Sequence, residues 1–368
     1  MSPIRPLQRA DLPQVAELYE LVVRSGRPTP PPELASYFER VLLDHPWADP
    51  EIPSLVHVDE HGSIVAFQGS SVRRARFDGR SIRIACAGQL VAHPDARHLA
   101  VGALIVRAYL AGPQELTITD TANDQMRQIW TLLGGEVVHL GCIAWARLLR
   151  PWGFADWYVR DRRLGRRRSS AGRALGVLDA ASTRWIGSVS PPAPPDLTAE
   201  TLTAAGLVEH LHLIGDRLRL HLDYDERYVA WLFDELARVR GLGTPVARLV
   251  RNRGGRVLGW YVYFLAPAGL SQVLQVAADD RHAGVVLDEL LYHAWSHGAA
   301  AVVGRLEPRL LRPLANRRSL LRHAGASALA HSGNQEILYA IASGESLLTR
   351  LDGEWWIQDR EVDLGGPT

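Results

Sequence analysis

The stretch VAHPDARHLAVGALIV, residues 91–106, reads as a strand that ends at a proline and passes directly into an apolar helix. Small residues stand at the start of that helix, namely Ala100, Gly102 and Ala103. They let a ligand approach the backbone, where the first N–H groups of a helix have no partner within it and the helix dipole favours negative charge. The crossing from strand to helix therefore predicts a site for an anionic group such as a diphosphate.

An alternation of strands and helices surrounds this crossing in the first half of the chain. The turn Asp78-Gly79 predicts a tight hairpin, and Gly134-Gly135 is typical of the end of a helix. Hairpins combined with a crossover unit indicate an α+β fold with a mixed, mostly antiparallel sheet. We expect strands over residues 3–7, 54–58, 63–77, 81–93, 115–122 and 136–149, and helices from residue 12, over 97–111 and over 123–133.

The second half repeats this order more weakly, which predicts two copies of one module, each a sheet flanked by helices. Two irregular stretches separate the copies, the arginine-rich 160–173 and the proline-rich 188–197. We expect an N-terminal module over 1–150, a connector over 151–198 and a C-terminal module over 199–368. The last module is expected to hold a helix over 224–239, a hairpin over 245–265, strand–helix pairs over 270–295 and 300–325, and late strands at EILYAIAS (336–343) and EWWIQ (354–358).

The composition limits the binding partners, the chemistry and the cellular compartment that we expect for the protein. Its 368 residues carry a formal net charge of +1, which gives no argument for binding DNA or an anionic membrane. All 41 basic residues are arginine, so lysine-based phosphate loops and Schiff bases are excluded. Cys86 and Cys142 are too few for a disulfide framework or a zinc site, and no apolar run reaches the length of a signal core or a membrane span. We expect a cytoplasmic protein without a metal.

Residues 91–95 (VAHPD) and 97–102 (RHLAVG) together resemble the acetyl-coenzyme A signature of the GNAT superfamily of acyltransferases. Ala100 stands where that signature usually has glycine. The helix expected over 123–133 and its Leu-Gly ending are similar to the family pattern as well. The resemblance covers residues 3–149 well and 200–357 loosely. It implies that an acyl-coenzyme A (acyl-CoA) is bound by Leu90, Val91, Arg97, His98, Leu99, Ala100, Val101, Gly102, Ala103 and Asn123.

The chemistry that this resemblance implies is direct N-acyl transfer, without a protein nucleophile. An amine, held against the thioester in a ternary complex, attacks it while a backbone N–H near Val91 stabilises the oxyanion. Cys86 and Gln89, on the preceding strand, are the candidate catalytic residues. Trp130 stands where the family often has a tyrosine that protonates the thiolate, so the sequence does not identify the general acid. The implied function is transfer of an acetyl group to the amine of a small molecule or an amino sugar.

The second copy of the crossing, residues 281–286 (RHAGVV), has Val286 where a side chain would crowd the path of a phosphate. We interpret this copy as structural or substrate-shaping. The tandem arrangement resembles mycothiol synthases and the Fem peptidyltransferases, so an aminoacyl-tRNA-dependent transferase is a second hypothesis. A non-catalytic binding protein with the same fold is a third.

The arginines of 160–173 are either a solvated connector or a clamp for an anionic acceptor. The sequence leaves open the acceptor, the acyl chain length and the oligomeric state.

Overall fold

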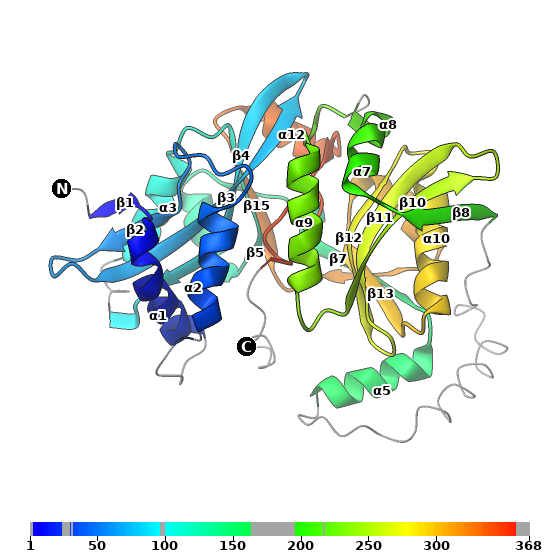
Figure 1. Cartoon of the computed structure of the whole chain (residues 1–368), viewed down its shortest axis with the longest axis horizontal. Coiled ribbons are helices and arrows are strands. Elements are labelled where there is room, and N and C mark those ends of the chain that lie inside the picture. Colours follow the sequence, from blue (N-terminus) through cyan, green and yellow to red (C-terminus); the bar gives the residue numbers. More distant parts are fainter. Residues whose placement is uncertain are drawn as a thin grey trace.

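The protein contains two β-sheets that lie side by side in space (Figure 1). Each sheet is built mainly from one half of the sequence. The structure is a computed structural model, and it describes residues 3–23, 30, 32–95, 100–162, 196–215 and 218–357. The arginine-rich stretch beyond residue 162 and the proline-rich stretch up to residue 195 lie outside the described residues, as do Arg97, His98 and Leu99.

The first sheet has the strand order β1-β2-β3-β4-β5-β15-β6, with β9 pairing β3 and β16 pairing β9. Its pairs are antiparallel except β4–β5 and β9–β16. The strands are β1 (Ile4–Pro6), β2 (Leu55–Val58), β3 (Ile64–Phe77), β4 (Arg80–Ala92), β5 (Leu116–Ala122), β6 (Glu136–Val137), β9 (Leu220–Leu222), β15 (Ser327–His331) and β16 (Ser346–Leu347).

The second sheet has the order β14-β7-β13-β12-β11-β10-β8 and is antiparallel except for the pair β12–β13. Each sheet is thus mixed and mostly antiparallel, and together with the flanking helices this confirms the predicted α+β fold of two similar modules. The strands are β7 (Ile143–Leu148), β8 (Leu197–Thr201), β10 (Thr244–Asn252), β11 (Val257–Leu265), β12 (Leu270–Ala278), β13 (Ala301–Arg305) and β14 (Leu320–His323).

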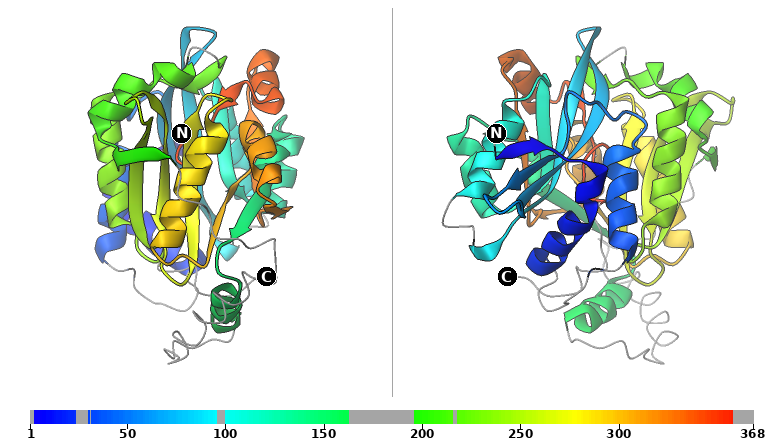
Figure 2. Two further views of the ribbon diagram at one scale, coloured as in Figure 1. Left: turned by 90° about the vertical axis from the view of Figure 1, so that its right-hand side faces the viewer. Right: turned by 60° about the vertical axis from the view of Figure 1, so that its left-hand side comes forward.

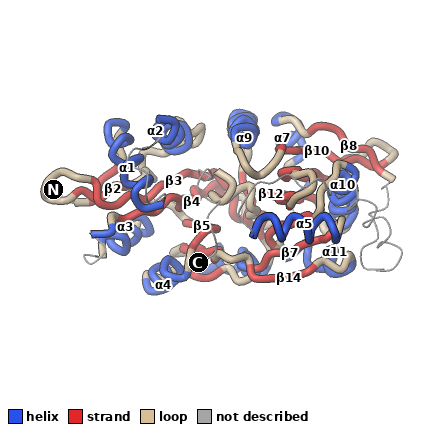
Figure 3. Tube along the Cα trace, turned by 90° about the horizontal axis from the view of Figure 1, so that it is seen from below, coloured by secondary structure: helices blue, strands red, loops and turns tan. Residues whose placement is uncertain are grey.

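Helices cover both faces of the sheets. Seen from below, α1, α2 and α9 lie on one side of the strands and α3 and α4 on the other (Figure 3). The helices are α1 (Leu12–Val23), α2 (Pro32–Phe38), α3 (Val101–Leu110), α4 (Asp124–Leu132), α5 (Pro151–Arg162), α7 (Ala204–His210), α8 (His212–Gly215), α9 (Glu226–Arg238), α10 (Ala283–Ser296), α11 (Leu311–Asn316) and α12 (Gln335–Ser343). A π-helical turn, η2 (Glu39–Leu43), continues α2, and short 3-10 turns cover Arg9–Asp11, Leu140–Cys142 and Pro308–Leu310.

Each sheet contains strands from the other half of the chain: β7 in the second sheet, and β9, β15 and β16 in the first. Strand β7 follows β6 in sequence but lies in the second sheet, between β13 and β14. Strand β15 comes from the second half and lies in the first sheet, between β5 and β6. The single strand predicted over 136–149 is therefore two strands of different sheets, separated by the turn at Leu140–Cys142. Because a strand exchanges its ladder hydrogen bonds with neighbours on both sides, each sheet depends on the other half of the chain.

The largest apolar core is continuous across both halves. It includes α1, α2 and η2 from the first half and α9, β11 and the C-terminal segment from the second. The Trp47 ring stacks on that of Tyr228 on α9, with centroids 3.6 Å apart, and the Trp47 indole donates to Asp225. Arg40 of η2 pairs with buried Glu235 of α9 at 2.7 Å. The segment α2–η2 and helix α9 accordingly lie side by side in two views (Figure 1, Figure 2).

Two strands expected near the C-terminus are wrong. Residues 336–343 belong to helix α12, because the Asn334 side chain caps its first turn and Gly344, at φ +83°, ends it. Residues 354–357 form a turn rather than a strand. The apolar residues of EILYAIAS fit the periodicity of a helix or of a strand, and the capping residues at both ends favour the helix.

The strand exchange predicts that neither half folds alone. Residues 1–150 expressed by themselves should lack a cooperative thermal transition in near-UV circular dichroism, because the first sheet then lacks β15, and residues 199–368 should behave in the same way. Co-expression of the two pieces should restore the transition. A cooperative transition of residues 1–150 alone would contradict the dependence, and would support the module boundaries at 150 and 199 as folding units.

Candidate functional site

A cleft opens in the first sheet where β4 and β5 separate. Their parallel ladder runs only from the pair Ile84–Leu116 to the pair Cys86–Ile118. Beyond it the strands diverge around a cavity of about 260 Å³. The cavity is lined by residues of α1, β3, β4, β5 and α4 and by the N-cap of α4, namely Tyr19, Val23, Gln68, Ala87, Gly88, Gln89, Leu90, Val91, Thr119, Thr121, Ala122, Asn123, Met126 and Trp130.

A β-bulge bends β4 away from β5. Two residues of β4, Gln89 and Leu90, stand opposite the single residue Gln68 of β3, and Gln89 has a left-handed backbone with φ +49°. The Gln68 side-chain amide holds the bulge, donating to the carbonyl oxygens of Gly69 at 2.8 Å and Gly88 at 3.0 Å. A Cβ at Gly69 would lie 2.8 Å from the Gly88 carbonyl oxygen, a backbone atom, so the bulge favours glycine there. The backbone edge of β4 beyond Cys86 is left facing the cleft.

Several predicted ligand residues meet at this cleft. Leu90 and Val91 line it from β4, and Asn123 lines it from the start of α4. The Asn123 side chain accepts the Met126 N–H at 2.8 Å and so caps that helix. Trp130 on α4 is 2% exposed and forms part of the wall.

The first turn of α3 lies against the end of β4. A Cβ built on Gly102 would be 3.9 Å from Ala92 Cβ, which is ordinary contact. The N–H groups of Ala103 and Leu104 both donate to the Ala100 carbonyl. Ala100 has φ +54°, a left-handed conformation that favours the glycine usual at this place in the GNAT signature. The predicted residues Ala100, Val101, Gly102 and Ala103 thus stand at the helix start, beside the strand that lines the cleft.

Glu354, which the sequence analysis did not single out, is buried where β4 and β5 separate. It is 2% exposed, and its Cγ would lie 3.3 Å from a Cβ on Gly88. Its Oε1 accepts the Thr119 hydroxyl at 2.5 Å, the Asp120 N–H at 2.8 Å and the Thr121 hydroxyl at 2.8 Å. Three donors on one oxygen fix the carboxyl group behind the cleft wall.

Burial sets the protonation of this group. Together with the neighbouring Asp120 carboxylate, it raises the pKa of Glu354 to about 8. The other oxygen, Oε2, accepts the Cys86 thiol at 3.3 Å. Burial raises the pKa of Cys86 well above its usual value, so this predicted catalytic residue keeps its proton and acts as a donor to Glu354.

Gln89, the other predicted catalytic residue, is tied to the same C-terminal segment. Its amide donates to the Tyr37 hydroxyl at 2.7 Å, and that hydroxyl donates to the Ile357 carbonyl at 2.5 Å. The bulge is therefore linked through α2 to residues next to Glu354 in sequence. This link cannot be predicted from a short sequence motif, because Tyr37 and Ile357 are 320 residues apart.

Both halves hold the segment 349–357, here called the wedge, that carries Glu354. On the first sheet the fully buried Arg73 of β3 donates through Nε to the Asp352 carbonyl at 3.1 Å. From the second half, Tyr224, between β9 and α9, donates its hydroxyl to the Asp352 carboxylate, which also accepts the Thr349 hydroxyl within the wedge. The Leu351 N–H donates to the Leu274 carbonyl at 3.1 Å. That contact lies just beyond the end of the β12–β13 ladder, so the wedge occupies the place where the strands of the second sheet separate.

The second copy of the strand-to-helix crossing is occupied by the protein itself. The Asp279 carboxylate accepts the N–H groups of Arg281 at 3.0 Å and His282 at 2.9 Å, in the position where an anionic ligand would bind a helix start. The Arg317 guanidinium covers Gly284, donating to its carbonyl at 2.6 Å. Val286 is fully buried in the core of the second half. It therefore packs inward rather than crowding a phosphate path.

Within the described residues, no helix is long and apolar enough to cross a membrane, and no group of His, Cys, Asp and Glu side chains is arranged to hold a metal ion.

Comparison with known proteins shows the fold. Neither a protein-family model nor a curated protein matches the sequence. Among solved structures, a probable N-acyltransferase of Enterococcus faecalis, itself of unknown function, is 11% identical, with 89% of this chain and 71% of that chain covered and a TM-score of 0.57. A GCN5-related N-acetyltransferase of Anabaena variabilis is 9% identical, with 90% and 73% covered and a TM-score of 0.55. Saccharomyces cerevisiae N-myristoyltransferase with bound myristoyl-CoA and inhibitors is 11% identical, with 90% and 80% covered and a TM-score of 0.50. The chain has the GNAT fold.

Glu354 predicts a characteristic dependence of stability on pH. Its pKa is raised in the folded state, from an ordinary 4.5 to about 8, so the folded protein binds a proton that the unfolded chain releases between these values. The free energy of unfolding should therefore fall as pH rises from about 4.5 to 8, by at most about 5 kcal/mol from this group. Urea unfolding of the wild type and of Glu354→Gln at pH 5, 6, 7 and 8 measures the difference. The variant should lose stability less steeply over this range, and parallel curves would contradict the assignment.

Proposed function

We propose that the chain is an acyl-CoA-dependent N-acyltransferase that transfers an acetyl group to the amine of a small molecule. The observation that carries the proposal is the cleft between β4 and β5, which leads along β4 to the first turn of α3. The names of the similar solved structures support acyl transfer in general. The choice of acetyl-CoA and of a small amine rests on the GNAT signature and on the cleft.

The first turn of α3 binds the diphosphate of the acyl-CoA, because N–H groups and the helix dipole point there and small residues admit the phosphates. The open edge of β4 over residues 87–91 binds the extended arm, since backbone groups on an unpaired strand edge can hydrogen-bond an elongated ligand. The bulge at Gln89 and Leu90 places the thioester carbonyl where backbone N–H groups stabilise the oxyanion.

Glu354 receives the proton of the attacking amine. Thr119 and Thr121 line the cleft and donate to Glu354 Oε1, so either hydroxyl can accept a proton from the amine as it passes its own to the carboxylate. The amine nitrogen forms a bond to the thioester carbon, the carbon–sulfur bond breaks, and coenzyme A leaves as the thiolate. Because its pKa is about 8, Glu354 is mostly protonated at pH 7, and the ionised form that serves as the base increases as pH rises toward 8.

Calorimetry with acetyl-CoA tests the binding site. We expect micromolar affinity for the wild type and a loss of at least tenfold, about 1.4 kcal/mol, in Ala103→Glu, because the new carboxylate would stand against the diphosphate. The matched control is Val285→Glu, at the equivalent third position of α10 and partly exposed. The control should bind like the wild type. Unchanged binding by a folded Ala103→Glu would place the site elsewhere.

A thiol-release assay then separates the transferase from the other two hypotheses. Release of coenzyme A that depends on an added amine supports the proposal, and Glu354→Gln should lower kcat by about a hundredfold with unchanged affinity for acetyl-CoA. Binding without any release would favour a non-catalytic binding protein. Amine-dependent deacylation of an aminoacyl-tRNA, without release of coenzyme A from acetyl-CoA, would favour a Fem-like transferase.

A further inference from the structure

A second cavity, of about 110 Å³, adjoins the cleft, since Thr119 lines both. Both halves of the chain build its walls. They include the exchanged strand β15, the end of β13 and the turn after it, and the wedge together with the residues before it. Much of the lining is apolar, with Ile118, Val138, Leu140, Val273, Leu274, Leu306, Leu310, Leu329, Ile341 and Leu348 among the side chains.

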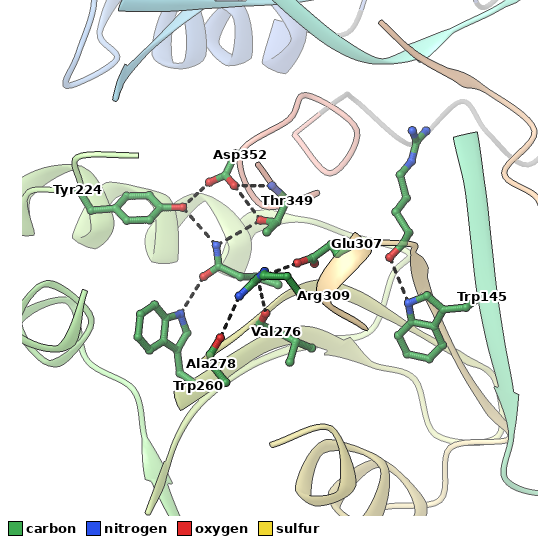
Figure 4. Close-up of polar contacts among 11 residues, drawn as sticks. Trp145, Tyr224, Trp260, Val276, Ala278, Glu307, Arg309, Thr349 and Asp352 are labelled. Atoms are coloured by element: carbon green, nitrogen blue, oxygen red, sulfur yellow. Dashed lines mark hydrogen bonds and ion pairs between the residues drawn. The ribbon is translucent and has the colours of Figure 1, made fainter. Parts of the chain in front are cut away.

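Most polar side chains around this cavity already have partners, although Asp120 Oδ2 and Arg305 Nε are buried without a hydrogen bond to any described residue. Glu307 pairs with Arg309 at 3.1 Å, and Arg309 also donates to backbone carbonyls of β12 (Figure 4). Thr349 donates to Asp352 at 2.8 Å and accepts from Gln275 at 3.2 Å (Figure 4). An occupant therefore finds few hydrogen-bonding groups that are not already engaged, and each hydroxyl that it buries would lose its water without gaining a partner.

The two arginines that line the cavity are engaged as well. The Arg305 guanidinium donates to the backbone carbonyls of Gly141, at 2.6 Å, and of Asp120. The Arg350 guanidinium lies over the Trp355 ring, 3.4 Å from its centroid. These contacts hold both cations against the protein, so they give no reason for an anionic occupant.

Glu354 lies between the cavity and the cleft. Its neighbour Gly353 lines the cavity, whereas Gly88 and Thr121, which contact the Glu354 side chain, line the cleft. Asp120, whose Oδ1 accepts the Glu354 N–H at 3.2 Å, adds a second carboxylate on the cavity side. Carboxyl groups at this wall, in a cavity with many apolar side chains and with other polar groups that are mostly engaged by the protein, complement an amine attached to an apolar group.

We propose that this cavity binds the acceptor of the reaction, a primary amine carried on an aliphatic or aromatic group, with its nitrogen beside Thr119, the residue that lines both the cavity and the cleft. This inference rests on the proposed N-acyltransferase function and narrows its substrate class. It excludes an amino sugar as the preferred acceptor, because several hydroxyls would be buried against side chains that already have partners.

Steady-state turnover with acetyl-CoA and three amines tests the substrate class. The amines are phenethylamine, isoamylamine and glucosamine. We expect a KM at least tenfold lower for the two apolar amines than for glucosamine. A preference for glucosamine, with acetyl-CoA turned over normally, would overturn the inference and leave the proposed function standing.

The cavity itself is tested by filling it. Leu348→Trp should weaken the apparent binding of phenethylamine, raising its KM at least tenfold without changing the affinity for acetyl-CoA, because Leu348 lines this cavity and not the cleft. The matched control is Leu132→Trp on α4, where the side chain is 86% exposed, and it should leave both values unchanged. If Leu348→Trp does not fold, Leu348→Ala serves instead. It should shift the preference toward an amine with a longer linker between nitrogen and ring, such as phenylbutylamine.

Two other outcomes would overturn the inference. If Leu348→Trp, or Leu348→Ala in its place, changes the discrimination between decanoyl-CoA and acetyl-CoA but leaves the KM for the amine unchanged, the cavity holds the acyl chain instead. If calorimetry shows no binding of acetyl-CoA to the wild type, the proposed function fails and the inference fails with it.

Discussion

The burial of Glu354 between β4 and β5 is the constraint on which the rest of the site depends. A carboxyl group without water must have hydrogen-bond donors, and Thr119, Thr121 and the Asp120 N–H supply them on one oxygen. These donors belong to β5, and the thiol on the other oxygen belongs to β4. The two diverging strands are thus connected through a residue of the opposite end of the chain, and this connection fixes the place where the cleft begins.

The second half of the chain gains a role from this arrangement. Its own strand separation holds the wedge. At its own strand-to-helix crossing, Asp279 accepts the N–H groups of the two residues before α10, and Arg317 covers Gly284, so both features are used internally. What it contributes instead is the positioning of the wedge, through Tyr224 and Leu274, and the strands β9, β15 and β16 of the first sheet. A repeated module has in this way become a support for the site of the other copy.

Much of the fold follows from local sequence. The turn Asp78-Gly79 adopts the positive φ angles that its hairpin requires, and Asn123 caps α4 at the start of the helix expected over 123–133. The order of strands and helices around residues 91–106 was enough to indicate the GNAT fold. The exchange of β7 and β15 could not be predicted, because periodicity shows that a strand exists and not which sheet it joins.

The residues of the candidate site also divide into those that local sequence predicted and those that it did not. Leu90, Val91 and Asn123 were found from a pattern of neighbouring residues, and they line the cleft. Glu354 was missed because its importance comes from contacts with residues more than 230 positions away, and EWW reads locally as a strand. A buried acid beside a polar cluster would need an alignment or a structure to be noticed.

The central claim is that acyl-CoA binds the first module, along β4 and at the start of α3. Hydrogen–deuterium exchange with and without saturating acetyl-CoA tests it most directly. The account predicts slower exchange in peptides covering 87–92 and 100–105, and unchanged exchange over 279–286. Protection over 279–286, with none over 100–105, would contradict it.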